Sequence, residues 1–133
     1  MSGFDPNIPI YIQIVNATKQ AIVSGTLKQG DRLTSVRERA ETLTVNPNTV
    51  QRAYQELERE GICETRRGTG TFIVERENLI EGLKNEMSRT VLRNFIDGMG
   101  ALGFAPDEIK AALARELAER TGGSHSWPSF SKQ

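Results

Sequence analysis

Apolar side chains recur at helical spacing near the start of the chain, and this pattern predicts a helix over residues 10–24 that stops at Gly25. A polar connection follows it. Ser35 and Glu38 then stand at capping-box spacing, in which each residue satisfies an exposed backbone donor of the other at a helix start. A second, short helix is therefore expected over about residues 36–43.

A third helix is expected after only a few more residues. Asn46 is a good N-cap, Pro47 suits the first helical position, and Gly61 suits the end. The apolar stripe of this helix consists of Val50, Ala53, Tyr54 and Leu57, and the polar side carries Asn48, Thr49, Gln51, Arg52 and Gln55. Two short helices joined by a tight turn, with polar groups exposed at the start of the second, match a helix-turn-helix.

Two short segments rich in β-formers, residues 62–65 and 71–74, flank a turn from Arg66 to Gly70 and predict a β-hairpin. The alternative is a loop that binds a nucleotide phosphate, but such a loop needs a helix after its glycines, and here a strand follows. A hairpin after a helix-turn-helix is a wing. Its tip would carry Arg66 and Arg67 toward a DNA backbone or minor groove, and Gly68 and Gly70 would allow close approach.

From about residue 77 the pattern changes to two amphipathic helices. The first is expected to break at Gly98, Gly100 and Gly103, and the second to run from Pro106 to about residue 120. Two isolated helices cannot bury their apolar faces alone, so we interpret these faces as a dimer interface rather than a ligand pocket. The interface residues expected are Leu83, Met87, Val91, Phe95, Ile109, Leu113 and Leu117.

The patterns predict an α+β, mostly helical fold: a winged helix-turn-helix DNA-binding domain over residues 1–76 and a helical dimerisation region over residues 77–121. Residues 122–133 are rich in Gly and Ser, and a mobile tail is expected there, with no role assigned to Trp127 or Phe130.

Charge and cysteine content narrow the function. The chain has 17 Lys and Arg against 17 Asp and Glu, so bulk attraction to nucleic acid is not expected, and any DNA binding must depend on where the arginines lie. Cys63 is the single cysteine and His125 the single histidine, which argues against disulfides and a zinc site. We expect Cys63 to be a buried, inert thiol.

No apolar run approaches the roughly 20 residues of a membrane span, so a cytoplasmic protein without a membrane partner is expected.

Three features follow one another along the chain: a first helix, the segment "SVRERAETLTVNPNTVQRAYQELEREG" and the segment "RRGTGTF". In these features and their order, the chain resembles the DNA-binding domain of the GntR family of bacterial winged-helix regulators over residues 8–75 or so. Thr34 stands where family members commonly have proline. The short pair of C-terminal helices resembles the YtrA-like branch. The resemblance implies a homodimeric regulator without a cofactor, usually a repressor, often of transporter genes, and it assigns no small-molecule effector.

The resemblance also implies which residues contact DNA. These are Ser35, Arg37, Asn46, Asn48, Thr49, Gln51, Arg52, Arg66, Arg67, Gly68, Thr69 and Gly70. Their chemistry agrees, because hydroxyls and helix N-termini suit phosphates, whereas Arg, Gln and Asn read base edges.

Each contact has a plainer alternative. Arg37 could instead pair with Glu41, and Arg52 with Glu56, across one helical turn. We expect Arg39, Arg59 and Arg76 to be solvated surface.

A sequence-specific DNA-binding regulator is therefore the favoured function, with an inverted-repeat operator as the DNA partner. One alternative is a winged-helix interaction module without DNA binding, although such a surface more often exposes apolar anchors. The other is a small enzyme, for which paired carboxylates, an activated nucleophile and a metal cluster are all lacking in the sequence.

Overall fold

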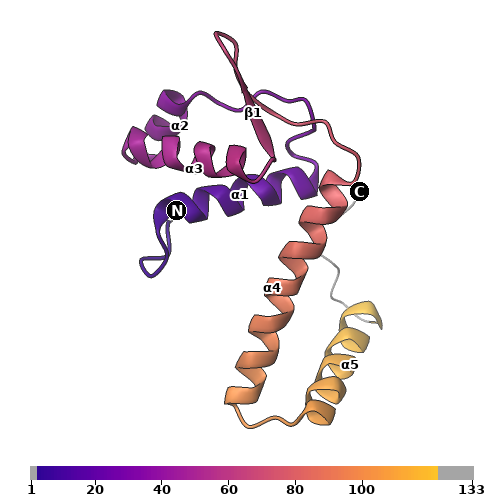
Figure 1. Ribbon diagram of the computed structural model, residues 1–133. Coiled ribbons are helices and arrows are strands. Elements are labelled where there is room, and N and C mark those ends of the chain that lie inside the picture. Colours follow the sequence, from indigo (N-terminus) through magenta and orange to yellow (C-terminus); the bar gives the residue numbers. More distant parts are fainter. Residues whose placement is uncertain (1–2, 123–133) are drawn as a thin grey trace. The chain divides into compact units, whose positions relative to one another are not determined.

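A computed structural model of the protein describes residues 3–122 (Figure 1). The chain divides into two compact units, Met1–Leu83 and Lys84–Gln133. The first unit contains three helices and a two-stranded antiparallel sheet, followed by the start of a fourth helix. The second contains the rest of that helix and a fifth.

Helices α1 (Ile10–Ser24), α2 (Val36–Leu43) and α3 (Pro47–Arg59) have the predicted bounds. Gly25 ends α1 in the left-handed conformation, with φ 89°. Asn46 caps α3, since its side-chain oxygen accepts a hydrogen bond from the Asn48 backbone N–H at 2.7 Å. The end of α1 and the start of α3 are therefore set by local chemistry that the sequence shows.

The capping box at the start of α2 forms only in part. The Ser35 hydroxyl accepts from the Glu38 backbone N–H at 3.1 Å, as predicted. The Glu38 carboxylate, however, contacts the Ser35 hydroxyl at 3.4 Å, and no hydrogen bond joins it to the Ser35 backbone N–H among the described residues. The serine thus caps α2 without the reciprocal contact.

The core of the first unit lies where α3 packs against both α1 and α2. The predicted stripe on α3 is buried, with Val50, Ala53 and Leu57 fully covered and Tyr54 4% exposed. The Tyr54 hydroxyl donates to the Thr34 backbone carbonyl at 2.6 Å, which ties α3 to the segment before α2. Burial of one face of α3 leaves its opposite face free.

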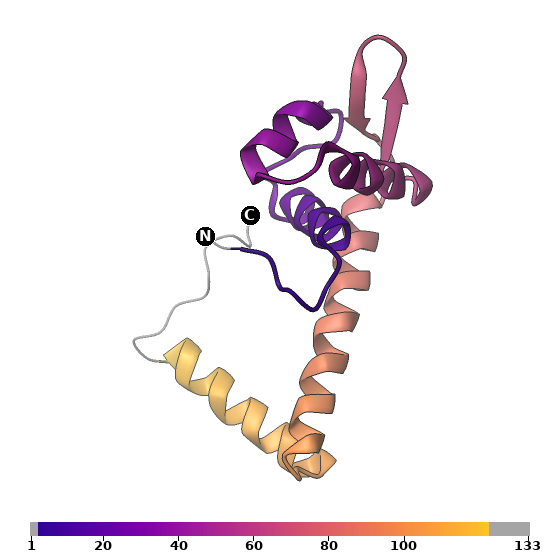
Figure 2. The same cartoon turned by 90° about the vertical axis from the view of Figure 1, so that its left-hand side faces the viewer.

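The wing consists of β1 (Cys63–Arg66) and β2 (Gly70–Ile73), with Arg66 paired to Gly70. Figure 2 shows this hairpin extending beyond the helices of the first unit. A third segment joins its edge: Arg32 bridges to Phe72, and the Leu33 backbone N–H donates to the Thr71 carbonyl at 2.8 Å. The sequence predicts only a polar connection here, because a single bridging residue leaves no repeating pattern of apolar positions.

Helix α4 (Leu79–Ala101) continues through Gly98 and Gly100, so the prediction that these glycines break it was wrong. A glycine inside a helix costs only about 1 kcal/mol relative to alanine, which a long helix tolerates. The break comes at Gly103 alone, with φ 95°. Helix α5 then spans Pro106–Gly122.

The first unit extends past the predicted domain boundary at residues 76 and 77. Leu79 and Leu83, at the start of α4, are 3% and 5% exposed and belong to its core. The predicted mobile tail, with Trp127 and Phe130, lies outside the described residues. Within residues 3–122, no helix is long and apolar enough to cross a membrane.

Replacing Tyr54 by Phe should lower the free energy of unfolding by about 0.5–1.5 kcal/mol, because the Thr34 carbonyl loses its hydrogen bond. Urea unfolding of the full chain measures this. Tyr11→Phe is the matched control, because no hydrogen bond to the Tyr11 hydroxyl is found in the described part of the chain. Equal stability of the Tyr54→Phe variant and the unsubstituted protein would contradict the prediction.

Candidate nucleic-acid interface

The face of α3 that points away from the core is polar. Asn48, Gln51, Arg52 and Gln55 are exposed there, and Thr49 is half-buried at its edge. Asn48, Thr49 and the next two polar residues lie in the first two turns of the helix, whose positive dipole end favours anions. This face has the size and chemistry to enter a DNA major groove.

The guanidinium of Arg52 lies over the ring of Tyr11 on α1, 4.0 Å from its centroid. The plainer pairing of Arg52 with Glu56 does not form. Glu56 instead binds Arg59, whose Nε donates to it at 3.0 Å, and this contact lowers the pKa of Glu56 to about 2. The N–H donors of Arg52 are therefore not occupied by Glu56.

At the start of α2, Arg37 is exposed and forms no ion pair with Glu41 within the described ranges. The hydroxyl of Ser35 has a partner, because it caps the helix. Arg37 is thus a free cation beside the N-terminus of a helix, whereas Ser35 has a structural role whether or not it contacts DNA.

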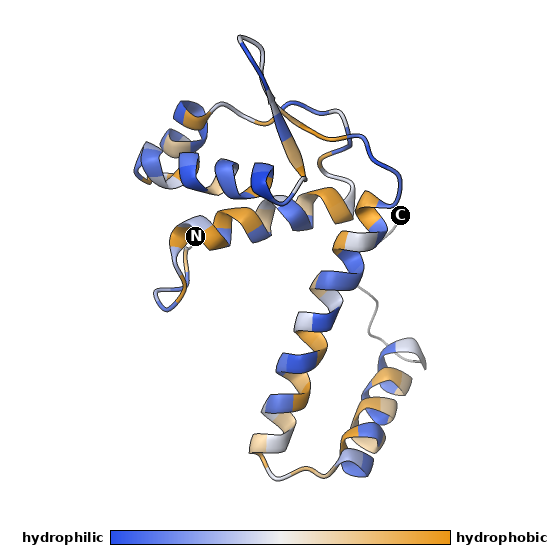
Figure 3. Cartoon of the chain, in the orientation of Figure 1, coloured by the Kyte–Doolittle hydropathy of each residue, from blue (hydrophilic) through white to orange (hydrophobic). Residues whose placement is uncertain are grey.

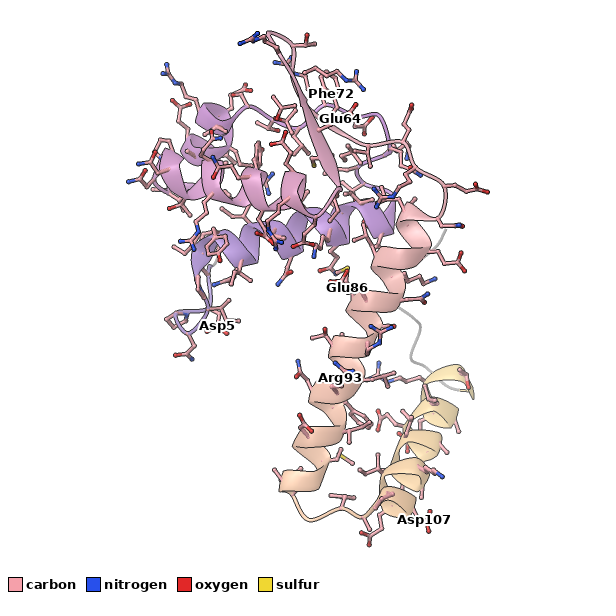
Figure 4. All side chains as sticks on the ribbon, viewed as in Figure 1. Asp5, Glu64, Phe72, Glu86, Arg93 and Asp107 are labelled. Carbon is pink, nitrogen blue, oxygen red and sulfur yellow. The ribbon has the colours of Figure 1, made fainter. Side chains whose placement is uncertain are left out.

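The two arginines predicted at the wing tip differ in their surroundings. Arg66 belongs to β1, where its guanidinium donates to Glu64 at 3.0 and 3.2 Å and lies over the ring of Phe72, 4.1 Å from the centroid (Figure 4). Arg67 lies in the turn, with no comparable partner among residues 3–122. Of these two arginines, Arg67 is therefore the one whose charge has no partner within the described residues.

The turn itself has the backbone that its glycines predict. Gly68 has φ 76° and Gly70 φ 132°, both in the region that side chains rarely adopt. Thr69, between them, donates its backbone N–H to the Arg66 carbonyl at 2.9 Å, which closes the turn. The tip is consequently narrow, and its backbone is open to approach at Gly68, where an added Cβ would meet nothing within 4 Å.

Arg32 was missed by sequence reasoning. It is exposed beside β2, and its side chain crosses Gly70, where an added Cβ would lie 2.7 Å from its Nε. It has no hydrogen bond or ion pair in the part of the chain that the structure describes. Its bridge to Phe72 brings it to the wing, so Arg32 adds a cation to that surface.

Of the three arginines expected on solvated surface, Arg59 and Arg76 are exposed and Arg39 is half-buried, and each also has a partner within the fold. Arg59 binds Glu56, and Arg76 donates to the Gly61 carbonyl at 2.6 Å. Arg39 contacts Tyr54, where its charge and hydrogen bond oppose the raised pKa that burial gives this phenol. These contacts separate the arginines that hold the fold from those that stay available.

The predicted interface residues of the second unit are mostly uncovered. Val91 is 67% exposed, Leu113 41% and Leu117 38%, while Met87, Phe95 and Ile109 are half-buried. Apolar positions recur along both α4 and α5 (Figure 3). Leu83 differs from the others, since it is buried in the first unit and leaves little surface for a partner.

Features of a catalytic centre are lacking in the described residues. No group of three or more His, Cys, Asp or Glu side chains could hold a metal ion there. Cys63 is buried, and burial raises the pKa of its thiol to about 12, so the thiolate nucleophile is not available near neutral pH.

Comparison with known proteins identifies one family of bacterial regulators. Residues 10–73 match the family model described as bacterial regulatory proteins, gntR family. The uncharacterized HTH-type transcriptional regulator YhcF of Bacillus subtilis is 46% identical over 80% of this chain and 88% of its own. The HTH-type transcriptional repressor YtrA of the same organism is 41% identical over 92% of this chain and 97% of its own.

A solved structure is similar over nearly the same extent. The GntR family transcriptional regulator from Listeria monocytogenes has a TM-score of 0.76 and 46% identity, covering 84% of this chain and 98% of that one. The matched residues include α3 and the wing, whose exposed chemistry suits DNA. The chain belongs to the GntR family, in its short YtrA-like branch, and is a DNA-binding transcriptional regulator rather than an enzyme.

Proposed function

We propose that the chain is a homodimeric repressor that reads an inverted-repeat operator through α3 and the wing. The observation that carries this proposal is the placement of unpaired arginines around the polar face of α3 in a chain without net charge. A relative with similarity along nearly the whole chain is named a repressor. Control of transporter genes is the target class that the YtrA-like resemblance favours.

The contacts divide by chemistry. Gln51, Arg52 and Asn48 carry the paired donors and acceptors that read bases in the major groove. Arg37 and Thr49, together with the helix starts at Ser35 and Asn46, suit phosphates. Residues 66–70 of the wing approach the backbone or minor groove, with Arg32 beside them.

Homodimer formation is supported by the exposed apolar side chains of the second unit. Leu92 is 54% exposed, Ile96 50% and Leu102 74%, in addition to the predicted interface residues. Clustered apolar surface of this kind marks an interaction site on a protein. Two copies paired about a two-fold axis would hold two α3 helices at a fixed spacing, with half-sites one DNA turn of about 10 base pairs, or a multiple of it, apart.

Arg52→Ala should weaken binding to the specific duplex by roughly 1–3 kcal/mol and binding to random duplex much less, because a base contact is lost. Titrations of both duplexes measure the two losses. The matched control is Arg115→Ala, which removes the same charge from an exposed position of α5, outside the proposed DNA surface. Equal losses on both duplexes would remove Arg52 from base readout.

Arg67→Ala should reduce the slope of log affinity against log salt by about 0.9, the value for one lost phosphate contact on duplex DNA. Arg66→Ala should change the slope less, since Glu64 already offsets its charge. Binding measured across a salt series compares the two variants. A larger slope change for Arg66→Ala than for Arg67→Ala would contradict this division of the wing.

Val91→Asp combined with Leu113→Asp should convert the full chain from dimer to monomer at micromolar concentration, because both charges enter the proposed apolar interface. Sedimentation equilibrium measures the mass. Asn85→Asp combined with Asn94→Asp is the control, with the same two added charges at exposed polar positions of α4. If the unsubstituted chain is itself a monomer, the proposed homodimer is wrong. DNA binding by one copy at a single half-site would then remain a separate question.

A further inference from the structure

The first turn of α1 meets the DNA-facing half of α3 at one pair of side chains. Tyr11 is half-buried against the core, and its ring underlies the guanidinium of the exposed Arg52 at 4.0 Å. With Ile10, Asn48 and Thr49, these residues line an open hollow of about 380 Å³. Tyr11 thus reaches the edge of the candidate DNA surface from a helix that sequence reasoning left out of it.

A stacked guanidinium keeps its hydrogen-bonding capacity. Its five N–H donors lie in its own plane, whereas the ring covers one face. An ion pair would instead engage those donors directly, as Glu64 does for Arg66. The stack therefore restrains Arg52 and leaves its planar fork available for a base edge.

The carboxylate nearest along α3 is kept from competing. Glu56 lies one helical turn from Arg52, the spacing at which Arg and Glu commonly pair. It is bound to Arg59 through both of its oxygens, Oε1 and Oε2. Arg52 is consequently held by an aromatic face and not by a charge.

We propose that Tyr11 is a positioning residue, which holds Arg52 in the orientation that reads a base and so sets specificity at that base pair. The inference rests on the proposed base reading by Arg52. An arginine on an exposed helix surface otherwise loses considerable side-chain entropy when it binds, and restraint before binding reduces this loss. Tyr11 needs no contact with DNA for this role.

The test selects duplexes from a random pool with four full-length proteins: the unsubstituted chain, Arg52→Ala, Tyr11→Leu and Tyr11→Phe. Tyr11→Leu should relax the preference at the same base pair as Arg52→Ala and at no other. Its affinity for the duplex that the unsubstituted chain selects should fall about two- to fivefold, as expected for an exposed cation–π contact. Tyr11→Phe keeps the aromatic face and should retain both preference and affinity.

A double-mutant cycle separates positioning from damage to the fold. In the Arg52→Ala background, Tyr11→Leu should have no further effect on affinity, because the side chain that it positions is absent. An equal loss in both backgrounds would mean that Tyr11 only supports the packing of α1, and the proposal would be overturned.

The remaining outcomes distinguish this inference from the proposed function. If Arg52→Ala relaxes a base pair and Tyr11→Leu does not, the positioning role is wrong and base reading by Arg52 stands. If Arg52→Ala leaves every preference intact, base reading by Arg52 fails and the positioning role fails with it. A selection in which the unsubstituted chain enriches no sequence would refute sequence-specific binding itself.

Discussion

Burial of one stripe of α3 is the constraint on which the site depends. Val50, Ala53 and Leu57 are fully covered between α1 and α2, so the helix cannot turn about its axis without exposing them. That packing fixes which polar residues face outward, and it places Arg52 against Tyr11. The orientation of the recognition surface is therefore a consequence of the core, not of the polar residues themselves.

The electrostatic attraction to DNA depends on where the charged side chains lie and not on the net charge of the chain. Positive and negative side chains are equal in number, yet their pairing is uneven. Glu56 binds Arg59 and Glu64 binds Arg66, so each of these carboxylates partly neutralises the charge of its arginine. Arg37, Arg52 and Arg67 have no such carboxylate partner, and they lie at the start of α2, on α3 and on the wing. A neutral chain can therefore still present a locally cationic surface to DNA.

The helices and strands could be predicted from signals within a few residues of each terminus. Contacts between residues far apart in the sequence could not be predicted in this way. Asn46, Pro47 and Gly25 act within one turn of their own positions, so the helix bounds follow from sequence. The bridge from Arg32 to the wing and the burial of Leu83 depend on residues brought together by the fold. The choice of Glu56 is local, but both Arg52 and Arg59 lie within one helical turn of it, so spacing alone does not decide between them. At Gly98 a local signal was misleading. The helix-breaking tendency of a glycine predicts an end there, but the long helix α4 continues through it.

Hydrogen exchange of the backbone amides, compared with and without a selected duplex, tests the central claim most directly. If α3 and the wing form the DNA surface, added protection should appear in residues 46–52 and 66–70. Amides of the buried turn of α3 around Leu57 are already covered by packing and should change little. Protection confined to α4 and α5, with no change at α3 or the wing, would contradict this account.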